Sequence, residues 1–320
     1  RRVNFTSTGT LALYGGDLGS ITRATASVVW WRDSLNIYVL PSATTTDTMI
    51  QYAVNGCDGG ETIHIGPGTF TETVTFNAAT DVVTLIGQGT DKTIITQAGA
   101  DTIVITDCGT ICIENLTLRG TAMDNDHVVN LNGATADASL TMRKVILTGL
   151  RDDNSAYGIY TQGGGDHSVT LTLDDCDVRM QGDALTYAVY SATTAGGGLN
   201  TMYFYNCYLQ AATDAAADCG DTLNLSLDCY AYSYNTTYSI SDINIGNVAT
   251  CVLRSHNDTI LCPITKALLG VMTCQVDPNA WEVHNGMEID DTINTMTAGD
   301  VIRVRPGTFP EVADLTIPAG

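Results

Sequence analysis

The sequence is poor in charge, and above all in positive charge. Charged residues make up 15% of the 320 residues, against about 25% in an average globular protein. Lys plus Arg number 14 against 35 Asp plus Glu, which gives a net charge of −21 and a pI near 4.2. Such a chain has no basic patch for a nucleic acid or an anionic membrane surface. No apolar run approaches the roughly 20 residues of a membrane span. We therefore expect no nucleic acid partner and no membrane insertion.

The sequence also lacks the patterns of long helices, β-hairpins and zinc sites. No stretch keeps a helical period over three turns, and no hairpin turn signals separate consecutive apolar runs. The ten cysteines form no paired CxxC spacing that histidines could complete. They are expected to be small buried hydrophobes or, in an oxidising compartment, disulfides.

A repeat dominates the middle of the chain. The pattern apolar-x-apolar-x-x-apolar-x-apolar starts at Ile111 and returns four times, the last time weakly. Its third apolar position falls at Leu116, Val145, Cys176, Cys207 and Tyr230, so the first three steps are nearly equal and the last is shorter. Two strands of period two with a two-residue interruption indicate a bend between short strands.

A second series of apolar segments runs in phase with the first. It starts at His127, Tyr157 and Tyr187, which are evenly spaced along the chain. Each repeat thus holds three short strands, and no helix or hairpin joins them. Repeats of this length with three strands predict an all-β protein, a parallel β-helix in which each coil covers the next.

The bends themselves carry polar residues. Their second positions are Asn115, Lys144, Asp175, Asn206 and Cys229. Asn and Asp suit a left-handed backbone residue. The first positions include Glu114, Arg143 and Asp174, which alternate in sign in a stack of coils. We expect a charge-paired stack that holds the register, with glycosidase or lyase chemistry as the alternative.

The opening of the chain resembles a known family. Asp47-Thr48, residues 60–76 (GETIHIGPGTFTETVTF) and residues 83–96 (VTLIGQGTDKTIIT) resemble the first coils of the pectin-lyase-like superfamily, and most of all pectin methylesterases. The resemblance implies a right-handed β-helix. The tail repeats this opening: residues 299–311 match residues 60–72 at seven of thirteen positions. Residues from about 287 therefore resemble the first coil of a second, incomplete β-helix.

The resemblance does not extend to catalysis. Residues 68–72 fit the first esterase motif, with Phe70 where the family has Tyr. The motifs Asp-Phe-(Ile/Val)-Phe-Gly and Gly-Arg-Pro-Trp, which supply the family's catalytic residues, are absent. We therefore assign no catalytic residue and expect no enzymatic activity. Related lyases use an Arg or Lys base and often calcium, so bases at Arg143, Lys144, Arg151 and Arg179 stay open as alternatives. We expect no cofactor; Ca²⁺ is the one metal left open, at the acidic turns of Asp124, Asp126, Asp152 and Asp153.

Two kinds of surface or core feature remain as candidate sites. If Val129, Ile159 and Val189 face inward, then Asn130, Tyr160 and Tyr190 face outward, where aromatic rings can bind sugars or pack on each other. Separately, Cys176 and Cys207 should stack inside successive coils, close enough for a disulfide or a pair of free thiols.

These observations combine into one hypothesis. We expect an N-terminal β cap over residues 1–46, a parallel β-helix over 47–286 and the start of a second β-helix over 287–320. The function expected is a non-catalytic structural module of an extracellular tandem array, located on a cell surface or a virion. Its partners would be copies of itself or adjacent β-helix modules. The expected assembly surface is apolar and comprises Ile302, Val304, Phe309, Leu315 and Ile317. The alternative is a polysaccharide-degrading enzyme, a tailspike-like depolymerase or a glycan-binding adhesin.

Overall fold

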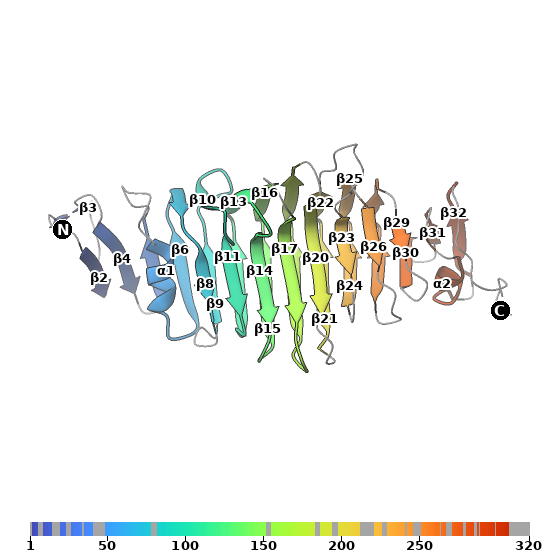
Figure 1. Cartoon of the computed structure of the whole chain (residues 1–320), viewed down its shortest axis with the longest axis horizontal. Helices are drawn as coiled ribbons and strands as arrows, with labels where there is room; N and C mark the ends of the chain where they lie inside the picture. The colour runs from blue at the N-terminus through green and yellow to red at the C-terminus, as the bar shows by residue number, and fades with distance from the viewer. Residues whose placement is uncertain are drawn as a thin grey trace.

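A computed structural model gives the fold of the chain as an elongated rod with β2 at one end and β32 at the other (Figure 1). The structure describes residues 35–40, 49–77, 82–151, 155–182, 186–193, 198–211, 221–225, 229–240, 242–245, 251–262, 264–266, 271–277, 280–284, 287, 289–297 and 299–306. Before these, it describes the backbone of the strands within residues 2–33.

One long sheet of fourteen strands runs the length of the rod. Its strands in spatial order are β2 (Gly9–Tyr14), β4 (Ser27–Asp33), β5 (Asn36–Val39), β6 (Glu61–Ile65), β9 (Val82–Ile86), β12 (Thr110–Glu114), β15 (Ala138–Arg143), β18 (Val169–Asp174), β21 (Asn200–Tyr205), β24 (Cys229–Tyr234), β27 (Val252–His256), β30 (Val271–Asp277), β31 (Ala280–Val283) and β32 (Val301–Val304). All neighbours in this order pair in parallel except β4 with β5 and β30 with β31.

Two parallel sheets of eight strands complete the solenoid. The second sheet consists of β7 (Gly68–Thr71), β10 (Thr93–Ala98), β13 (Thr117–Met123), β16 (Ile146–Arg151), β19 (Asp177–Gln181), β22 (Tyr208–Ala211), β25 (Thr237–Ile240) and β28 (Thr259–Ile260). The third sheet consists of β8 (Val74–Phe76), β11 (Ile103–Thr106), β14 (His127–Gly133), β17 (Ala156–Gly163), β20 (Thr186–Thr193), β23 (Asp221–Leu225), β26 (Asp242–Ile245) and β29 (Ile264–Lys266). Strands β1 (Arg2–Phe5) and β3 (Ser20–Arg23) form a separate parallel pair. The fold is the expected right-handed parallel β-helix.

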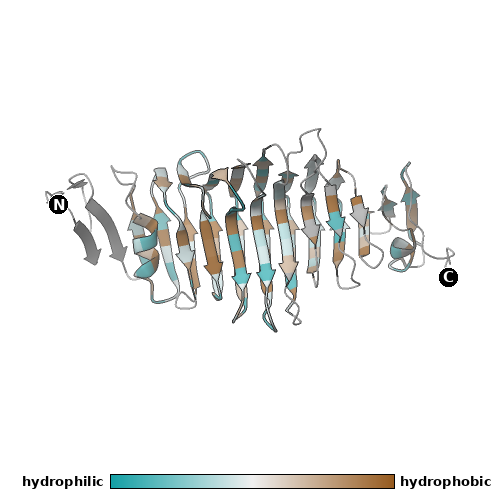
Figure 2. Ribbon diagram, viewed as in Figure 1, coloured by the Kyte–Doolittle hydropathy of each residue, from teal (hydrophilic) through white to brown (hydrophobic). Residues whose placement is uncertain are grey.

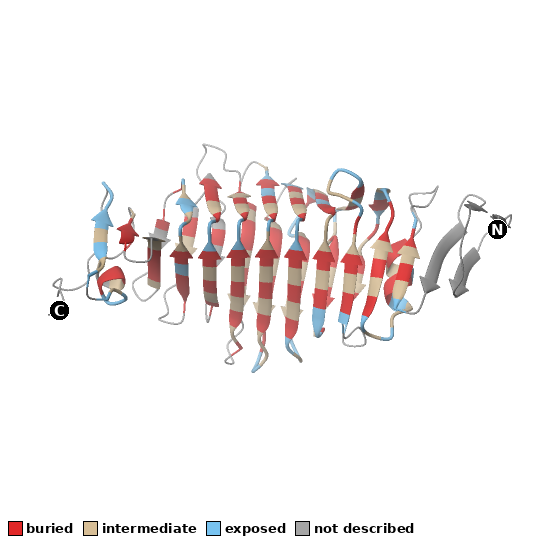
Figure 3. Cartoon of the chain, turned by 180° about the vertical axis from the view of Figure 1, so that it is seen from behind, coloured by how far each residue is buried: buried red, intermediate tan, exposed pale blue. Residues whose placement is uncertain are grey.

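The core is a set of apolar stacks that run along the rod. Ile111, Leu140, Leu171 and Met202 occupy equivalent positions of β12, β15, β18 and β21, and all are fully buried. Buried and less buried residues alternate along these strands, as period two requires (Figure 3). Bands of apolar and polar residues likewise cross the strands that lie in front in Figure 2. Each such side chain contributes about 1.5–3 kcal/mol by leaving water, so the solenoid is held mainly by these interior stacks.

The bends between the long sheet and the second sheet form a ladder of left-handed residues. Asn115, Lys144, Asp175 and Asn206 have φ values of 59°, 51°, 52° and 53°, so these four predicted bends are confirmed. The structure adds two further bends, at Asn235 and Asn257. Each bend residue donates its backbone N–H to a carbonyl of the next coil, as Asp175 does to Tyr205 over 3.0 Å.

The fifth bend was expected in the wrong place. Cys229 is a buried residue at the start of β24, and the bend lies later in the chain, at Asn235. The third core position of this coil is therefore Thr236 rather than Tyr230. The pattern is hidden in the sequence because Ser233 and Thr236, two polar residues, point into the core here.

A hydrogen-bond network satisfies these interior polar groups. Tyr238, fully buried, donates its hydroxyl to Ser233 Oγ over 2.7 Å. Asp258 accepts from the Thr236 backbone N–H and from Ser255 Oγ, both at 2.7 Å. Burial raises the pKa of both Asp258 and Tyr238. Buried polar groups are tolerated when they are bonded in this way, which explains how these coils depart from the apolar pattern.

Two short helices lie beside the ends of the long sheet, α1 (Met49–Asn55) and α2 (Ile289–Ile293). Glu72, which is 2% exposed, accepts the backbone N–H groups of Ile50 and Gln51 at 3.0 and 2.9 Å and so holds the first turn of α1. In the part of the chain that the structure describes, no helix has the length and hydropathy needed to span a bilayer.

Candidate functional site

The predicted row of outward residues lies on the third sheet. Asn130 of β14 pairs with Tyr160 of β17, which pairs with Tyr190 of β20. The inward partners Val129, Ile159 and Val189 are fully buried, as the alternation requires. Asn224 and Asn244 continue the row on β23 and β26. The structure therefore brings the three predicted carbohydrate-binding residues into one continuous polar and aromatic surface.

A second aromatic row lies beside the first and strengthens it. His127, Tyr157 and Tyr187 stack in order, with centroid distances of 5.0 Å in both steps. Tyr160 and Tyr190 stack at 5.6 Å with planes 6° apart. Edge contacts at 5.0–5.6 Å join the two rows. We call His127, Tyr157, Tyr160, Tyr187 and Tyr190 the aromatic ladder.

Asp101 fixes the end of the aromatic ladder. Its carboxylate accepts the His127 backbone N–H at 2.7 Å, contacts His127 Nδ1 at 2.9 Å and accepts Asn130 Nδ2 at 2.9 Å. Burial raises the pKa of Asp101, but the hydrogen bonds from His127 and Asn130 outweigh it and leave the pKa below its ordinary value. The carboxylate thus stays ionised, holds the histidine ring against Tyr157 and orients Asn130.

The stacking of the rings and the protonation of their hydroxyls determine which interactions the aromatic ladder can form. The rings stack on one another, so neighbouring rings cover part of each other's faces. Burial raises the pKa of Tyr160, so its hydroxyl stays protonated at neutral pH and can both donate and accept hydrogen bonds. A hydroxyl of this kind can form hydrogen bonds with hydroxyl-rich ligands.

The charged bend residues are paired with one another. Arg143 Nη1 lies 2.9 Å from Glu114 Oε1, and Arg143 Nε lies 4.0 Å from Asp174 Oδ2. These residues sit in register on β12, β15 and β18. The prediction of a stack of alternating charge is confirmed. All three side chains are substantially exposed, so the stack stabilises the fold only slightly.

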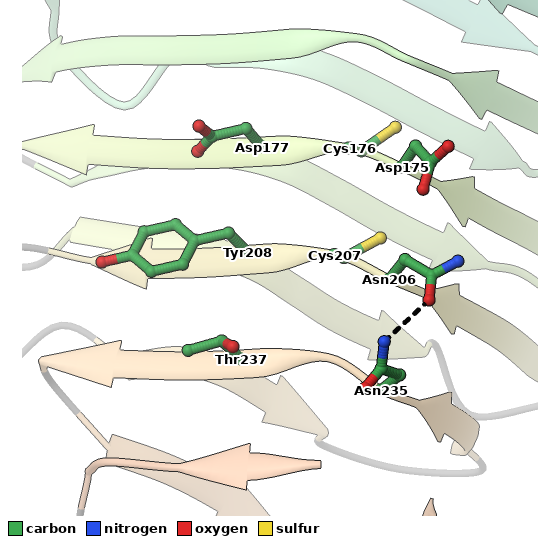
Figure 4. Close-up of a pocket in the computed structure, with 8 residues that line it drawn as sticks. All are labelled: Asp175, Cys176, Asp177, Asn206, Cys207, Tyr208, Asn235 and Thr237. Atoms are coloured by element: carbon green, nitrogen blue, oxygen red, sulfur yellow. Dashed lines mark hydrogen bonds between the residues drawn. The ribbon is translucent and has the colours of Figure 1, made fainter. Parts of the chain in front are cut away.

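A shallow surface groove of about 420 Å³ lies beside this stack (Figure 4). Asp177 within it is bound to Arg179 at 2.6 Å, and the Arg179 guanidinium lies 5.0 Å from the centre of the Tyr208 ring. Asn235 donates its side-chain amide to Asn206 over 3.0 Å at the edge of the groove (Figure 4). Asp177 and Arg179 could in principle serve lyase or hydrolase chemistry, but here they form an ion pair with each other.

Cys176 and Cys207 line the inner side of the same groove, one coil apart. Both side chains are buried, and neither forms a disulfide. A hydrogen bond to Cys176, together with burial, raises the pKa of Cys207. The two residues thus stack at equivalent positions as thiols.

A second aromatic surface was missed by the sequence analysis. Tyr203, Tyr232 and Arg254 occupy one outward row of β21, β24 and β27, with the tyrosine rings 5.4 Å apart. Tyr232 and Arg254 line a groove of about 290 Å³ that reaches Trp281 of β31. The alternation of tyrosines in β24 could have predicted this surface. Because the fifth bend was expected at the wrong residue, Tyr230 and Tyr232 were predicted to lie in the core instead.

The remaining predicted sites are placed as follows. Lys144 is an exposed bend residue. Asp124 and Asp126 lie in one turn, where the Asp124 backbone N–H donates to Asp126. Asp152 and Asp153 lie outside the described residues, as does the side chain of Arg151. Among the residues that are described, no three His, Cys, Asp or Glu side chains are arranged to hold a metal ion.

The predicted assembly surface is only partly described. Ile302 is half-buried against the core, and Val304 is 49% exposed. Phe309, Leu315 and Ile317 lie outside the described residues. That this segment packs on material outside the chain's own solenoid stays a prediction; within the chain, β32 pairs in parallel with β31. The pairing arises because the β30–β31 hairpin turns the chain back to offer β32 an edge.

No protein-family model matches the chain. No curated protein matches it significantly. Among solved structures, pectin methylesterase PemA from Erwinia chrysanthemi is similar, with 14% identity, a TM-score of 0.41, and 69% of this chain and 89% of that chain covered. The pectin methylesterase from Yersinia enterocolitica has 14% identity and a TM-score of 0.35, with 74% and 92% covered.

At these identities the likeness is one of fold alone. The strand pairing described above, taken by itself, already makes the chain a parallel β-helix. The chain is a right-handed parallel β-helix.

Proposed function

We propose that the chain is a non-catalytic structural module of an extracellular tandem β-helix array, a surface filament or a virion fibre, joined to its neighbours through the ends of the solenoid. The observation that carries the proposal is the long sheet itself. It does not stop at either end of the solenoid but continues through a hairpin into further strands, to β4 and β2 at one end and to β31 and β32 at the other.

The state of the charged residues supports a structural role. Arg143, the best-placed candidate base, is held between Glu114 and Asp174. The hydrogen bond to Glu114 raises the pKa of Arg143 further above its already high ordinary value. A guanidinium that never loses its proton cannot serve as a base, whereas its ion pairs hold three neighbouring coils in register.

Electron microscopy and activity assays test this proposal together. We expect single particles of the chain to be rods, and we expect no release of methanol, unsaturated uronides or reducing ends from pectins or alginates, with or without calcium. Turnover that Arg143→Ala or Asp175→Ala abolishes, and that the outward control Thr172→Ala leaves intact, would replace the structural role with an enzymatic one.

Glycan binding is the second candidate, and the aromatic ladder favours it. Tyr160 and Tyr190 are half-buried residues of one row, a strand spacing of about 4.8 Å apart, and Asn244 lies farther along the same row. Such a row can follow an extended polysaccharide by hydrogen bonds to its hydroxyls.

Affinity electrophoresis through gels that contain neutral or acidic polysaccharides tests this candidate. Retardation by one of these polymers should be lost in a Tyr160→Ala, Tyr190→Ala double variant and kept in Tyr203→Ala, which removes an outward tyrosine from the long sheet instead. Equal migration of all three proteins with and without polymer would eliminate the ladder as a glycan site.

A further inference from the structure

The long sheet contains the same unusual feature twice. Among the described strands, its two antiparallel pairings are β4 with β5 and β30 with β31, each across a two-residue connection. In the first hairpin Asp33 pairs with Asn36, and in the second Asp277 pairs with Ala280. The offset in sequence number from Asp33 to Asp277 is 244, and the offset from Asn36 to Ala280 is the same.

The elements after each hairpin also correspond. A short helix follows in both cases, and then a strand that pairs in parallel with the second strand of the hairpin. Ile37 of β5 pairs with Ile63 of β6, and Trp281 of β31 pairs with Ile302 of β32. The offset from Ile63 to Ile302 is 239, so the second connection is slightly shorter than the first.

This register agrees with an independent alignment of sequence. Residues 299–311 match residues 60–72 at an offset of 239, the same offset that the strand pairing gives for Ile63 and Ile302. Pairing geometry and residue identity therefore equate β6 with β32. Two such agreements are not expected from a chance resemblance of short segments.

The strands before the first hairpin resemble the last coils of the solenoid. Leu11 of β2 pairs with Val29 of β4, and Leu253 of β27 pairs with Met272 of β30, so these two coils are short and nearly equal in length. In the middle of the rod a coil is much longer, as the pairing of Leu140 with Leu171 shows. By coil length, β2 and β4 correspond to β27 and β30.

We infer that the polypeptide is built from tandem β-helix modules whose period is the offset between the two hairpins, and that the partner of β32 is the second coil of a following copy in the same polypeptide. Strands β2 and β4 are then the last coils of one module, and β5 to β30 form the next. The inference rests on the proposed function and specifies its partner. Among the described residues, β32 is the last strand in the order of the long sheet, so such a coil would pair with its outer edge.

The test is a duplicated chain in which residues 1–277 are followed directly by residues 34–320. This joins Asp277 to Ser34 and exchanges one hairpin for the other. The duplicated segment adds ten strands to the long sheet, from β5 to β30, so the rod should lengthen by roughly 48 Å at about 4.8 Å per strand. Small-angle X-ray scattering and electron microscopy measure this length.

A second fusion and a control keep the result interpretable if one junction fails to fold. Joining Arg305 to Pro67 retains β31, α2 and β32 and should also add ten strands to the long sheet, from β9 to β32. The control joins residue 277 to residue 47 and so omits β5. We expect the two matched fusions to be single straight rods and the control to be two rods with a flexible joint.

If both matched fusions scatter like the jointed control, the tandem period is wrong. Catalytic turnover on a polysaccharide would instead refute the non-catalytic role and leave the length measurement untouched, so the two failures can be told apart.

Discussion

The substitution Lys144→Asn should stabilise the protein, because Lys144 is the one residue in the bend ladder that does not suit its backbone. Its φ is 51°, in the left-handed region, whereas the equivalent residues Asn115, Asp175 and Asn206 are Asn or Asp. A residue with a Cβ in this region costs about 1–2 kcal/mol, which the short polar side chains of Asn and Asp reduce by bonding locally. Lys144 is exposed, so the change disturbs no packing.

The neighbouring coils indicate what the new side chain would bind. Asn235 donates its amide to Asn206 of the preceding coil at 3.0 Å, and Asn257 donates to Asn235 at 3.4 Å. The amide introduced by Lys144→Asn would donate in the same way to Asn115. A net hydrogen bond contributes about 0.5–1.5 kcal/mol, and the loss of one exposed cation costs between about 0 and 1 kcal/mol. We expect a net gain of about 1 kcal/mol in the free energy of unfolding.

Chemical denaturation followed by circular dichroism measures this gain, and a thermal scan should show a rise in Tm of about 2 °C. Lys144→Ala is the matched control, because it removes the same charge but keeps a Cβ in the left-handed region without an amide. If Lys144→Asn is no more stable than Lys144→Ala, the account of the bend ladder is wrong.

Three further predictions concern the core, a thiol and a carboxylate. Phe204→Ala should lower the free energy of unfolding by about 3–5 kcal/mol, because removing a fully buried ring leaves a cavity. The change Tyr203→Ala at its outward neighbour should cost less than about 1.5 kcal/mol. Equal losses in urea titrations would refute the assignment of Phe204 to the inner face of the strand and Tyr203 to the outer face. Burial and the nearby Glu114 raise the pKa of Cys112 to about 11. Alkylation of Cys112 by iodoacetamide should therefore be slow at pH 8 and faster in Glu114→Gln. An alkylation rate at pH 8 equal to that of a free thiol would contradict the raised pKa. The pKa of Asp101 is lowered, so the stability that its carboxylate contributes is complete above the ordinary pKa of 3.8 and is lost as the pH falls through the folded pKa. Asp101→Asn should therefore flatten the fall in the free energy of unfolding below pH 3.8. An unchanged fall in that range would show that the carboxylate is not held by His127.

The strand pattern made the fold predictable wherever the core is apolar. From Leu116 to Cys207, the positions of the repeat pattern are buried hydrophobic residues, so period two and the two-residue bend are visible in the sequence. The prediction failed one coil later, where Ser233 and Thr236 point inward. Those residues are tolerated because Tyr238 and Asp258 bond with this part of the core, and such partners are brought together only by coiling.

One part of the candidate site could be predicted from the sequence and another part could not. The outward direction of Tyr160 and Tyr190 follows from alternation with Ile159 and Val189, so the sequence was enough to place them on one face. That Asp101 clamps His127 and Asn130 could not be foreseen, because Asp101 precedes them by a whole coil and nothing local relates their side chains.

What the sequence by itself determined is the periodic part of the protein: strand alternation, bend positions, coil length and the repeat of residues 60–72 at 299–311. These depend on which side chains are apolar and which backbone conformations a residue tolerates, both of which are local properties. Only the tertiary structure decided how the ends of the solenoid continue. The first hairpin reverses the strand across Ser34-Leu35, which is no strong turn signal, whereas the second has Asp277-Pro278-Asn279, a common turn sequence. Neither turn shows which strand edges it joins, because those edges exist only once the coils have stacked.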